Sequence, residues 1–268
     1  MTEIESATGN AGEGAAAVKL TALAAYLDSM LETDRGGDAC PNGLQVEGRD
    51  TVSKVATGVS ACLELFERAE RAEADAVLVH HGIFWKGADP TLTGVQYRRV
   101  KSLLDSGLSL LAYHLPLDRH PELGNNALAA RALGLDDLAP FGFFEGEAIG
   151  FRGRYSEPIA ATEFFDRCRI VFDQEPMVLD SGPRRVETAG IVSGGAQRAL
   201  GEAIDLGLDA FITGEISEWV QNLARESETH YVAAGHYATE RLGIRALGVH
   251  IAEHFGIETE FIDVPNPV

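Results

Sequence analysis

Histidines and carboxylates recur in this sequence at spacings that suit the binding of divalent metal ions. Two histidines are adjacent, and two others each precede an acidic residue by four positions. Imidazole nitrogens and carboxylate oxygens are ligands of zinc, iron, manganese, cobalt and nickel. Four histidines and two acids exceed what one tetrahedral ion needs, but two ions about 3.5 to 4 Å apart, bridged by a carboxylate, would use them all. The candidate ligands are His80, His81, His114, Asp118, His236 and Glu240.

Each of these motifs also has a purely structural explanation. Adjacent residues at a strand end point to opposite faces, so one of His80 and His81 could simply be buried and hydrogen-bonded. A histidine four residues before an acid could be an ordinary helical pair. Because three such interruptions fall at equivalent strand ends, we favour the metal site. The remaining histidines His120 and His230 lie in turn-rich or polar surroundings and are predicted to be surface residues.

A competing motif lies near the C-terminus, where residues 250–254 read His-Ile-Ala-Glu-His. It fits the helical His-x-x-Glu-His pattern of inverted zinc proteases, in which two histidines chelate zinc and the glutamate is a general base. Only 14 residues follow His254, so a third ligand would have to come from upstream, against the usual order. We therefore favour a helix with two half-exposed histidines near its C-terminal end, where the helix dipole favours positive charge.

The candidate ligands are positioned by alternating helices and strands, which the spacing of the apolar residues predicts. Two of the predicted strands end in the candidate histidines, and open α/β sheets place their ligand sites at strand ends. The predicted helices cover 18–31, 61–74 and 97–106, and the predicted strands cover 54–59, 76–79 and 108–113.

An internal repeat is visible in this order of elements. Val59-Ser60 is followed by Asp75-Ala76, a short apolar run and a polar corner at the histidine pair. Val192-Ser193 is followed by Asp209-Ala210, another apolar run and a polar corner at Gly214-Glu215. In both places the His-x-x-x-acid motif and a helix-ending glycine come next.

The repeat predicts an α/β protein built from two similar halves, with sheets covered by helices. The halves cover about 18–139 and 188–268 within a single domain, 18–268. The charge-rich and turn-rich segment 140–187 is predicted to be a connector that docks on the main body, because it is too short for an independent domain. Residues 1–17 are predicted to be a disordered acidic tail.

Composition excludes several classes of protein. The 268 residues are 45% hydrophobic, which is enough for a sizeable core. Their net charge of -19 argues against nonspecific binding to nucleic acid or to an anionic membrane. Three scattered cysteines indicate neither a disulfide framework nor a thiolate zinc site. No apolar run approaches the ~18 residues needed to span a bilayer, and no signal peptide is recognisable, so we expect a cytoplasmic protein.

The basic residues are unevenly divided, because only four of the 22 are lysines. An acid-rich, lysine-poor surface is typical of a high-salt cytosol, where repulsion between exposed carboxylates is screened.

Four longer motifs are specific enough to indicate a family. They are 209–215 (Asp-Ala-Phe-Ile-Thr-Gly-Glu), 234–240 (Ala-Gly-His-Tyr-Ala-Thr-Glu), 80–82 (His-His-Gly) and 261–267 (Phe-Ile-Asp-Val-Pro-Asn-Pro). In these motifs the chain resembles the YbgI-type dinuclear metal-centre family, whose members are often labelled GTP cyclohydrolase I type 2 homologues. The resemblance runs from about residue 18 to the C-terminus.

This resemblance implies a hexameric toroid with a two-metal site in each subunit, facing the inner cavity. Carried over by position, it implies that His81 and Asp118 hold one metal, that His80 and His236 hold the other, and that Glu240 bridges them. His114 matches an additional pocket histidine, expected as a ligand or as a hydrogen-bond donor beside one. Some relatives carry a further domain between the halves, where this chain has only the short connector.

The family label implies opening of the purine ring of GTP, in which hydroxide attacks C8 and formate is released. The sequence holds no Gly-x-x-x-x-Gly-Lys phosphate loop and no lysine cluster, but Arg119, Arg241 and Arg245 lie near the candidate ligands and could supply charge. We therefore expect a dinuclear metal-dependent hydrolase-like protein with a small-molecule substrate. The alternative is a non-catalytic metal-binding ring that acts as a metal store, metallochaperone or scaffold.

Overall fold

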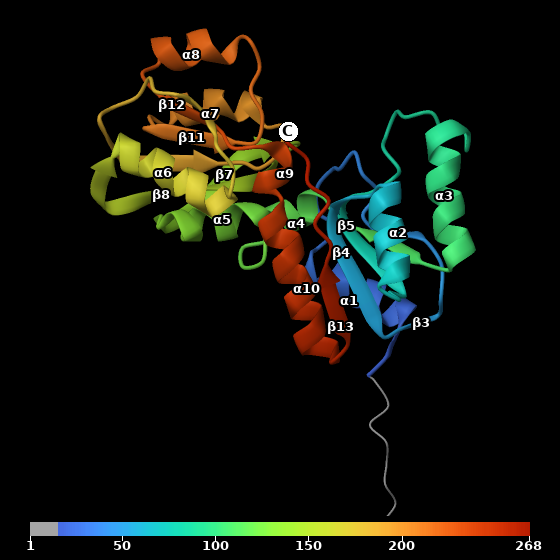
Figure 1. Cartoon of the computed structure of the whole chain (residues 1–268). Helices are drawn as coiled ribbons and strands as arrows, with labels where there is room; N and C mark the ends of the chain where they lie inside the picture. Colours follow the sequence, from blue (N-terminus) through green and yellow to red (C-terminus); the bar gives the residue numbers. More distant parts are fainter. Residues whose placement is uncertain (1–15) are drawn as a thin grey trace, which may run out of the picture.

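Two β-sheets, each covered by helices on both faces, organise the chain (Figure 1). The computed structural model describes residues 16–268. All but the last two residues of the predicted tail therefore lie outside the described residues. Both sheets hold three parallel strands in chain order, with an antiparallel strand beside the third. The mixed α/β architecture predicted from the sequence is confirmed, while the duplication of the halves stays a prediction.

The first sheet has the strand order β13-β4-β5-β6-β2. Its strands are β2 (Gly43–Val46), β4 (Lys54–Ser60), β5 (Ala76–His81), β6 (Ser109–Ala112) and β13 (Glu258–Phe261). The helices on its two faces are α1 (Leu20–Met30), α2 (Leu63–Arg71), α3 (Gly94–Ser106) and α10 (Arg241–Phe255). A separate two-stranded ribbon joins β1 (Val18–Lys19) to β3 (Thr51–Val52).

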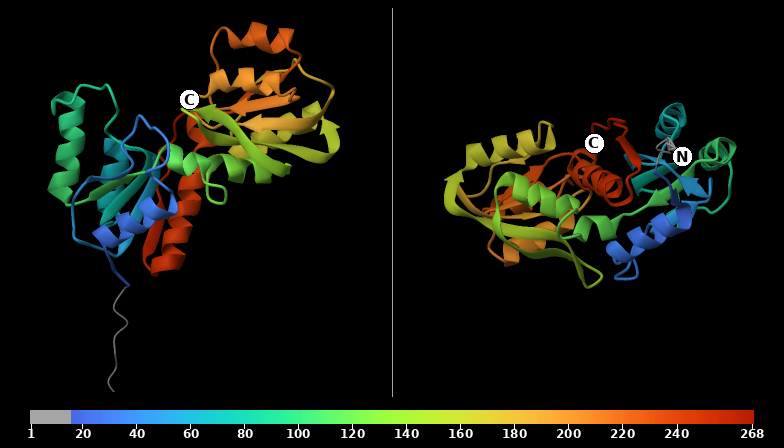
Figure 2. Two further views of the ribbon diagram at one scale, coloured as in Figure 1. Left: turned by 180° about the vertical axis from the view of Figure 1, so that it is seen from behind. Right: turned by 90° about the horizontal axis from the view of Figure 1, so that it is seen from below.

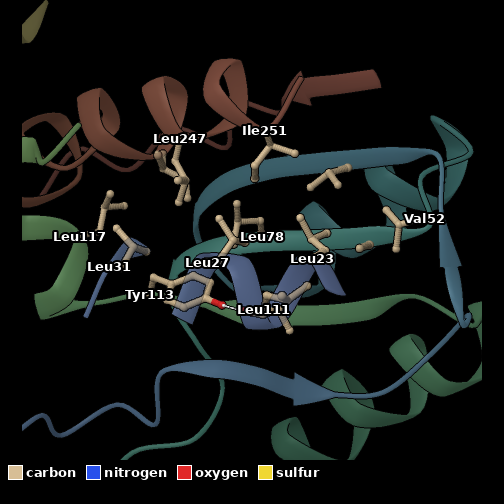
Figure 3. Close-up of a cluster of buried hydrophobic side chains, with 14 of the residues drawn as sticks. Leu23, Leu27, Leu31, Val52, Leu78, Leu111, Tyr113, Leu117, Leu247 and Ile251 are labelled. Carbon is tan, nitrogen blue, oxygen red and sulfur yellow. Dashed lines mark hydrogen bonds between the residues drawn. The ribbon is translucent and has the colours of Figure 1, made fainter. Parts of the chain in front are cut away.

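The apolar run of β5 is continuous because both faces of this sheet are buried. Leu78 packs on the side of α1 and α10, whereas its neighbours Val77 and Val79 pack on the side of α2 and α3. Figure 3 shows the first of these cores, in which Leu27 of α1 and Leu247 of α10 lie beside Leu78.

The second sheet has the strand order β7-β8-β10-β11-β12-β9. Its strands are β7 (Asp136–Phe144), β8 (Glu147–Ala160), β9 (Met177–Leu179), β10 (Arg185–Ile191), β11 (Ala210–Thr213) and β12 (His230–Ala233). Helices α5 and α6 pack on one face, and α7 and α8 on the other. The helices are α5 (Asn125–Leu133), α6 (Ala161–Phe172), α7 (Leu200–Asp205) and α8 (Val220–Glu226), with short connecting helices α4 (Leu115–Arg119), η1 (Gln197–Ala199) and α9 (His236–Thr239).

Two features depart from the predicted organisation. The segment 140–187 is an integral part of the second sheet, because it supplies β8, β9 and half of β7. The last part of the chain returns to the first sheet, where β13 pairs in parallel with β4. The apolar face of α10 packs into the first core. Both views of Figure 2 show the last part of the chain, in red, back beside the blue part of the first lobe. The two lobes in space therefore do not coincide with the predicted halves.

None of the helices among residues 16–268 is both long and apolar enough to span a bilayer.

Candidate metal centre

All six candidate ligands predicted from the sequence meet between the two lobes. The first sheet supplies His80 and His81 at the end of β5, and the second supplies His236 and Glu240 after β12. The segment that follows β6, between the two sheets, carries His114 and Asp118. Three groups of three side chains have ligand atoms within 4.8 Å of one another, and they are His80/His81/His114, His81/His236/Glu240 and His80/Asp118/Glu240.

The group formed by His80, Asp118 and Glu240 is buried. The Nε2 atom of His80 lies 3.5 Å from Oδ2 of Asp118 and 3.5 Å from Oε1 of Glu240. Its Nδ1 lies 3.0 Å from the Tyr113 carbonyl oxygen, which can only accept, so Nδ1 donates. In a neutral ring, Nε2 then presents a lone pair to two carboxylates.

Two atoms of this group, His80 Nε2 and Glu240 Oε2, are buried without a hydrogen-bond partner among the described residues. Buried polar atoms are almost always paired, and a cation between these two atoms would satisfy both. The residues present therefore fit a bound metal ion.

The second group shares Glu240 with the first. Nε2 of His81 lies 3.2 Å from Oε2 of this glutamate, and Nε2 of His236 lies 3.2 Å from Oε1. Glu240 thus belongs to both groups, as a bridging carboxylate would.

The groups of possible ligands are arranged differently from the pairing that the family resemblance implied, which stays a prediction. His80 is grouped with Asp118, and His81 with His236, the reverse of the expected assignment. Both histidines at the end of β5 nevertheless reach the same site, because they share a group with His114 and their ring centroids lie 4.7 Å apart.

The Nδ1 atom of every candidate histidine is held by a partner, which directs Nε2 into the site. A hydrogen bond from metal-binding histidines to carboxylates, hydroxyls or carbonyls is typical, because it fixes the tautomer and the ring orientation. The remaining partners are Ser60 Oγ for His81 (3.0 Å), Asp38 Oδ1 for His114 (2.7 Å) and Glu215 Oε1 for His236 (2.6 Å).

Sequence reasoning did not identify Asp38 as part of this site. Asp38 lies in the turn-rich segment before β2, where no periodic pattern marks it. It accepts hydrogen bonds from His114 Nδ1 and from the backbone N–H of Leu115, and so fixes the start of α4.

Asp118 is oriented by two further residues that the sequence did not single out. Its Oδ1 accepts hydrogen bonds from Nδ2 of Asn125 and from Oγ of Ser193, both at 2.9 Å. Its Oδ2 is left to face His80. One oxygen thus anchors the carboxylate to the fold while the other is available as a ligand.

The electrostatics of the site favour positive charge at the point where the ligands converge. Burial lowers the pKa of His80, but the carboxylates of Asp118 and Glu240 outweigh this effect and raise the pKa to about 9. Burial is also the main cause that lowers the pKa of His81 to about 3, and the neighbouring histidines add to it. Despite its burial, Glu240 has a pKa held well below the usual value by His81 and His80.

Gly194 provides the space for the shared carboxylate. Its φ is +67°, and a Cβ at this position would lie 2.4 Å from Oε1 of Glu240 and 3.1 Å from Nε2 of His236. Only glycine both adopts this backbone conformation easily and leaves the carboxylate in place.

A cavity of about 630 Å³ opens onto this site, and five of the six candidate ligands line it. Arg198, on η1, is also in the lining, whereas the arginines named from the sequence are elsewhere. Arg241 donates to the Phe172 carbonyl, and Arg245 lies over the ring of Phe261. Arg119 lines a different cavity. Closeness in sequence to the ligands therefore misled the prediction.

The competing histidine motif has a structural role. The hydroxyl of Tyr26 lies 2.7 Å from Nε2 of His250, and the Tyr26 ring stacks on His254 with centroids 4.0 Å apart. In the described part of the chain, neither histidine belongs to a group of three possible ligands. The prediction of an ordinary helix at 250–254 is confirmed.

The prediction that His230 is a surface residue is wrong. His230 is fully buried because it begins β12, a strand inside the second sheet. Its Nδ1 accepts from the backbone N–H of Gly182 at 3.1 Å, and its Nε2 donates to the Pro183 carbonyl at 2.7 Å. His120 is partly buried, and its Nδ1 accepts backbone N–H groups of Glu122 and Leu123.

Comparison with known proteins places this geometry in context. The model of the Duf34/NIF3 (NGG1p interacting factor 3) family matches residues 18–267. A Pseudomonas aeruginosa protein named GTP cyclohydrolase 1 type 2 homolog is 45% identical over 251 residues, covering 94% of this chain and 99% of its own length. An Escherichia coli protein of the same name is 42% identical, covering 93% of this chain and all of its own.

Solved structures of similar proteins share the fold of this chain. A structure described as protein ybgI, of unknown function, has a TM-score of 0.88 at 42% identity, and the match covers 94% of this chain and all of that one. A crystal structure from Thermus thermophilus has a TM-score of 0.85 at 36% identity, with the same coverage.

Proposed function

Since the chain belongs to the Duf34/NIF3 family, we propose that it is a metal-dependent hydrolase-like protein whose site takes two divalent metal ions. The relatives named GTP cyclohydrolase 1 type 2 homolog make GTP the first substrate to test. The proposed ligands are His80 and Asp118 for one ion and His81 and His236 for the other, with Glu240 shared.

One observation carries this proposal. Two buried polar atoms, Nε2 of His80 and Oε2 of Glu240, have no hydrogen-bond partner among residues 16–268, while Nδ1 of His80 is anchored to the Tyr113 carbonyl. A structural cluster would be expected to satisfy its own polar atoms, and this cluster leaves unsatisfied the atoms that a metal ion would use.

Bound ions would polarise a substrate oxygen or nitrogen and lower the pKa of a water molecule. The chain's own residues orient the ligands through the Nδ1 contacts, and Asp118 and Glu240 compensate the positive charge. His114, held by Asp38, lines the cavity and is not a member of either group that contains Glu240. It is therefore available to hold or move a proton at Nε2.

Turnover is the test of this function. We expect the metal-loaded protein to release formate from GTP repeatedly, and the Glu240→Gln variant to lose this activity because the shared carboxylate charge is gone. Glu253→Gln is the matched control, since Glu253 is exposed on α10 and outside the site. Reversible metal binding with no product from GTP would instead favour the non-catalytic alternative of a metal store, metallochaperone or scaffold.

The assembly also belongs to this proposal. From the family resemblance we infer a homohexameric ring of cytoplasmic subunits. Sedimentation velocity of the full chain measures the subunit number, and a monomer would contradict the ring.

A further inference from the structure

Three aromatic side chains are exposed around the mouth of the candidate metal centre. Trp85 is 36% exposed, Phe143 is 60% exposed and Phe144 is 47% exposed, and all three line the same cavity as the ligands. Exposed apolar surface that gathers in one place often marks a binding site, so three partly exposed rings in one pocket indicate a surface that a ligand covers.

The position of Trp85 is fixed next to the site. Its indole N–H donates to the Gly82 carbonyl at 3.2 Å. Its ring lies edge-on to His114 with centroids 5.2 Å apart, and 5.9 Å from the ring of His81. A ligand ring that covers Trp85 would therefore be next to the candidate metal ligands.

The phenylalanines come from the other lobe, at the end of β7. The backbone N–H of Phe143 donates to Oε2 of Glu202 on α7 at 3.1 Å, which holds this strand end in place. The cavity is thus lined by aromatic rings from both lobes and by histidines of the candidate metal centre.

Charge in the lining limits what the rest of the ligand can carry. Arg198 is the one arginine or lysine in the lining, and no carboxylate of residues 16–268 forms an ion pair with it. Four carboxylates also line the cavity and would repel further negative charge, and they belong to Asp38, Asp118, Glu202 and Glu240. One anionic group on the ligand would be matched by one guanidinium.

We propose that this pocket binds a planar nitrogen heteroaromatic ring of nucleobase size, held against Trp85 and Phe143, with one anionic group at Arg198. The reaction that the bound ring undergoes rests on the proposed function. The binding of the ring does not, because it is inferred from the cavity lining alone. The ring supplies most of the affinity, and phosphate groups beyond the first add little.

Tryptophan fluorescence provides the test. The chain has two tryptophans, so Trp219→Phe leaves Trp85 as the only indole reporter in the full-length, metal-loaded protein. Trp219 lies just before α8 and does not line the cavity. The probes are guanosine, guanosine 5′-monophosphate, ribose 5-phosphate and inorganic triphosphate. We expect saturable quenching by the first two, and none by the other two at the same concentration.

Two variants in this background separate the contacts. Phe143→Ala should weaken the binding of guanosine 5′-monophosphate roughly tenfold or more, which is the usual effect of removing an aromatic ring that stacks on a base. Arg198→Gln should reduce the affinity for guanosine 5′-monophosphate to that for guanosine. It should leave the affinity for guanosine unchanged. Ile170→Ala and Arg225→Gln are the controls, because both positions are exposed and outside the cavity, and neither should change binding.

The inference is overturned if ribose 5-phosphate or triphosphate binds as tightly as the monophosphate, if guanosine gives no quenching, or if Phe143→Ala has no effect. Failure of the hydrolase proposal looks different. Ring binding that depends on Phe143 but is followed by no turnover supports the pocket assignment and removes the reaction. Turnover that is insensitive to Phe143→Ala supports the reaction and removes the pocket assignment.

Discussion

At the scale of single residues, Glu240 is where the two ligand groups meet. It follows α9, is 2% exposed, and has one oxygen near His81 and the other near His80 and His236. A buried carboxylate is costly unless cations or hydrogen-bond donors surround it. The surrounding histidines meet that need best when they bind protons or metal ions that add positive charge.

Replacing Gly194 tests how closely the backbone fits this carboxylate. Gly194→Ala places a methyl group against Glu240, and we expect metal binding to be largely lost. Gly207→Ala is the matched control, because φ is +66° there but no atom of residues 16–268 lies within 4 Å of the added Cβ. Both variants should lose about 1 kcal/mol of stability from backbone strain. Metal titration followed by calorimetry distinguishes them, and equal affinities would contradict the proposed close fit.

The pH dependence of stability tests the charge balance at the same residues. The pKa values of His80 and His236 are raised to about 9, above the ~6.5 of an unfolded chain. Each therefore stabilises the fold fully below pH ~6.5, and this contribution is lost as pH rises through about 9. After treatment with a chelator, the melting temperature of the protein should therefore fall as the pH rises from ~6.5 to about 9.

Metal-loaded protein is the comparison for this measurement, since ions replace the protons and remove most of the fall. A melting temperature of the chelated protein that is flat or rises over the same interval would show that the two histidines are not protonated in the folded state.

The sequence identified these candidate ligands because the histidines interrupt apolar patterns at strand ends and each of the two acids follows a histidine by four positions. It could not identify Asp38, Asn125 or Ser193, because their roles depend on hydrogen bonds to residues 75 or more positions away in two cases and on a buried helix start in the third. The error at His230 has a similar cause, since a polar residue at a strand start looks exposed until the sheet around it is known.

At the scale of elements, α10 connects the site to the core of the first lobe. It begins directly after Glu240, and its residues Ile244, Leu247 and Ile251 lie in the first core (Figure 3). Its position therefore depends on packing far from the metal centre. Any loosening of this helix would be transmitted to the shared carboxylate.

Truncating Leu247 tests the contribution of this packing. Leu247 is fully buried, so Leu247→Ala should lower the free energy of unfolding by about 2 to 5 kcal/mol. Val249→Ala, at a position 57% exposed on the same helix, should change it by less than about 0.5 kcal/mol. Urea denaturation measures both, and a similar loss in the two variants would contradict the role assigned to the buried face.

The parallel strands β4, β5 and β6 were predictable because each is a short apolar run between helices. The pairing of β13 with β4 was not, because it joins residues about 200 positions apart and leaves no local pattern. The place of β8 in the second sheet was not predictable either, because its sequence pattern indicates a strand but not the sheet to which the strand belongs.

At the scale of the whole molecule, the candidate metal centre lies between two lobes that each supply ligands. Bound ions would therefore connect the lobes, and the cavity beside them is lined from both sides. The net charge of -19 adds repulsion within the folded chain, which cations at the site would reduce.

Metal content per subunit tests the central claim most directly. It would be measured by mass spectrometry on protein purified without chelators, for wild type, Glu240→Gln and the exposed control Glu253→Gln. The proposed site predicts about two ions per subunit in wild type and control, and a sharp fall in Glu240→Gln. If wild type binds no metal even after reconstitution, the histidines at the strand ends are structural and the proposed function is wrong.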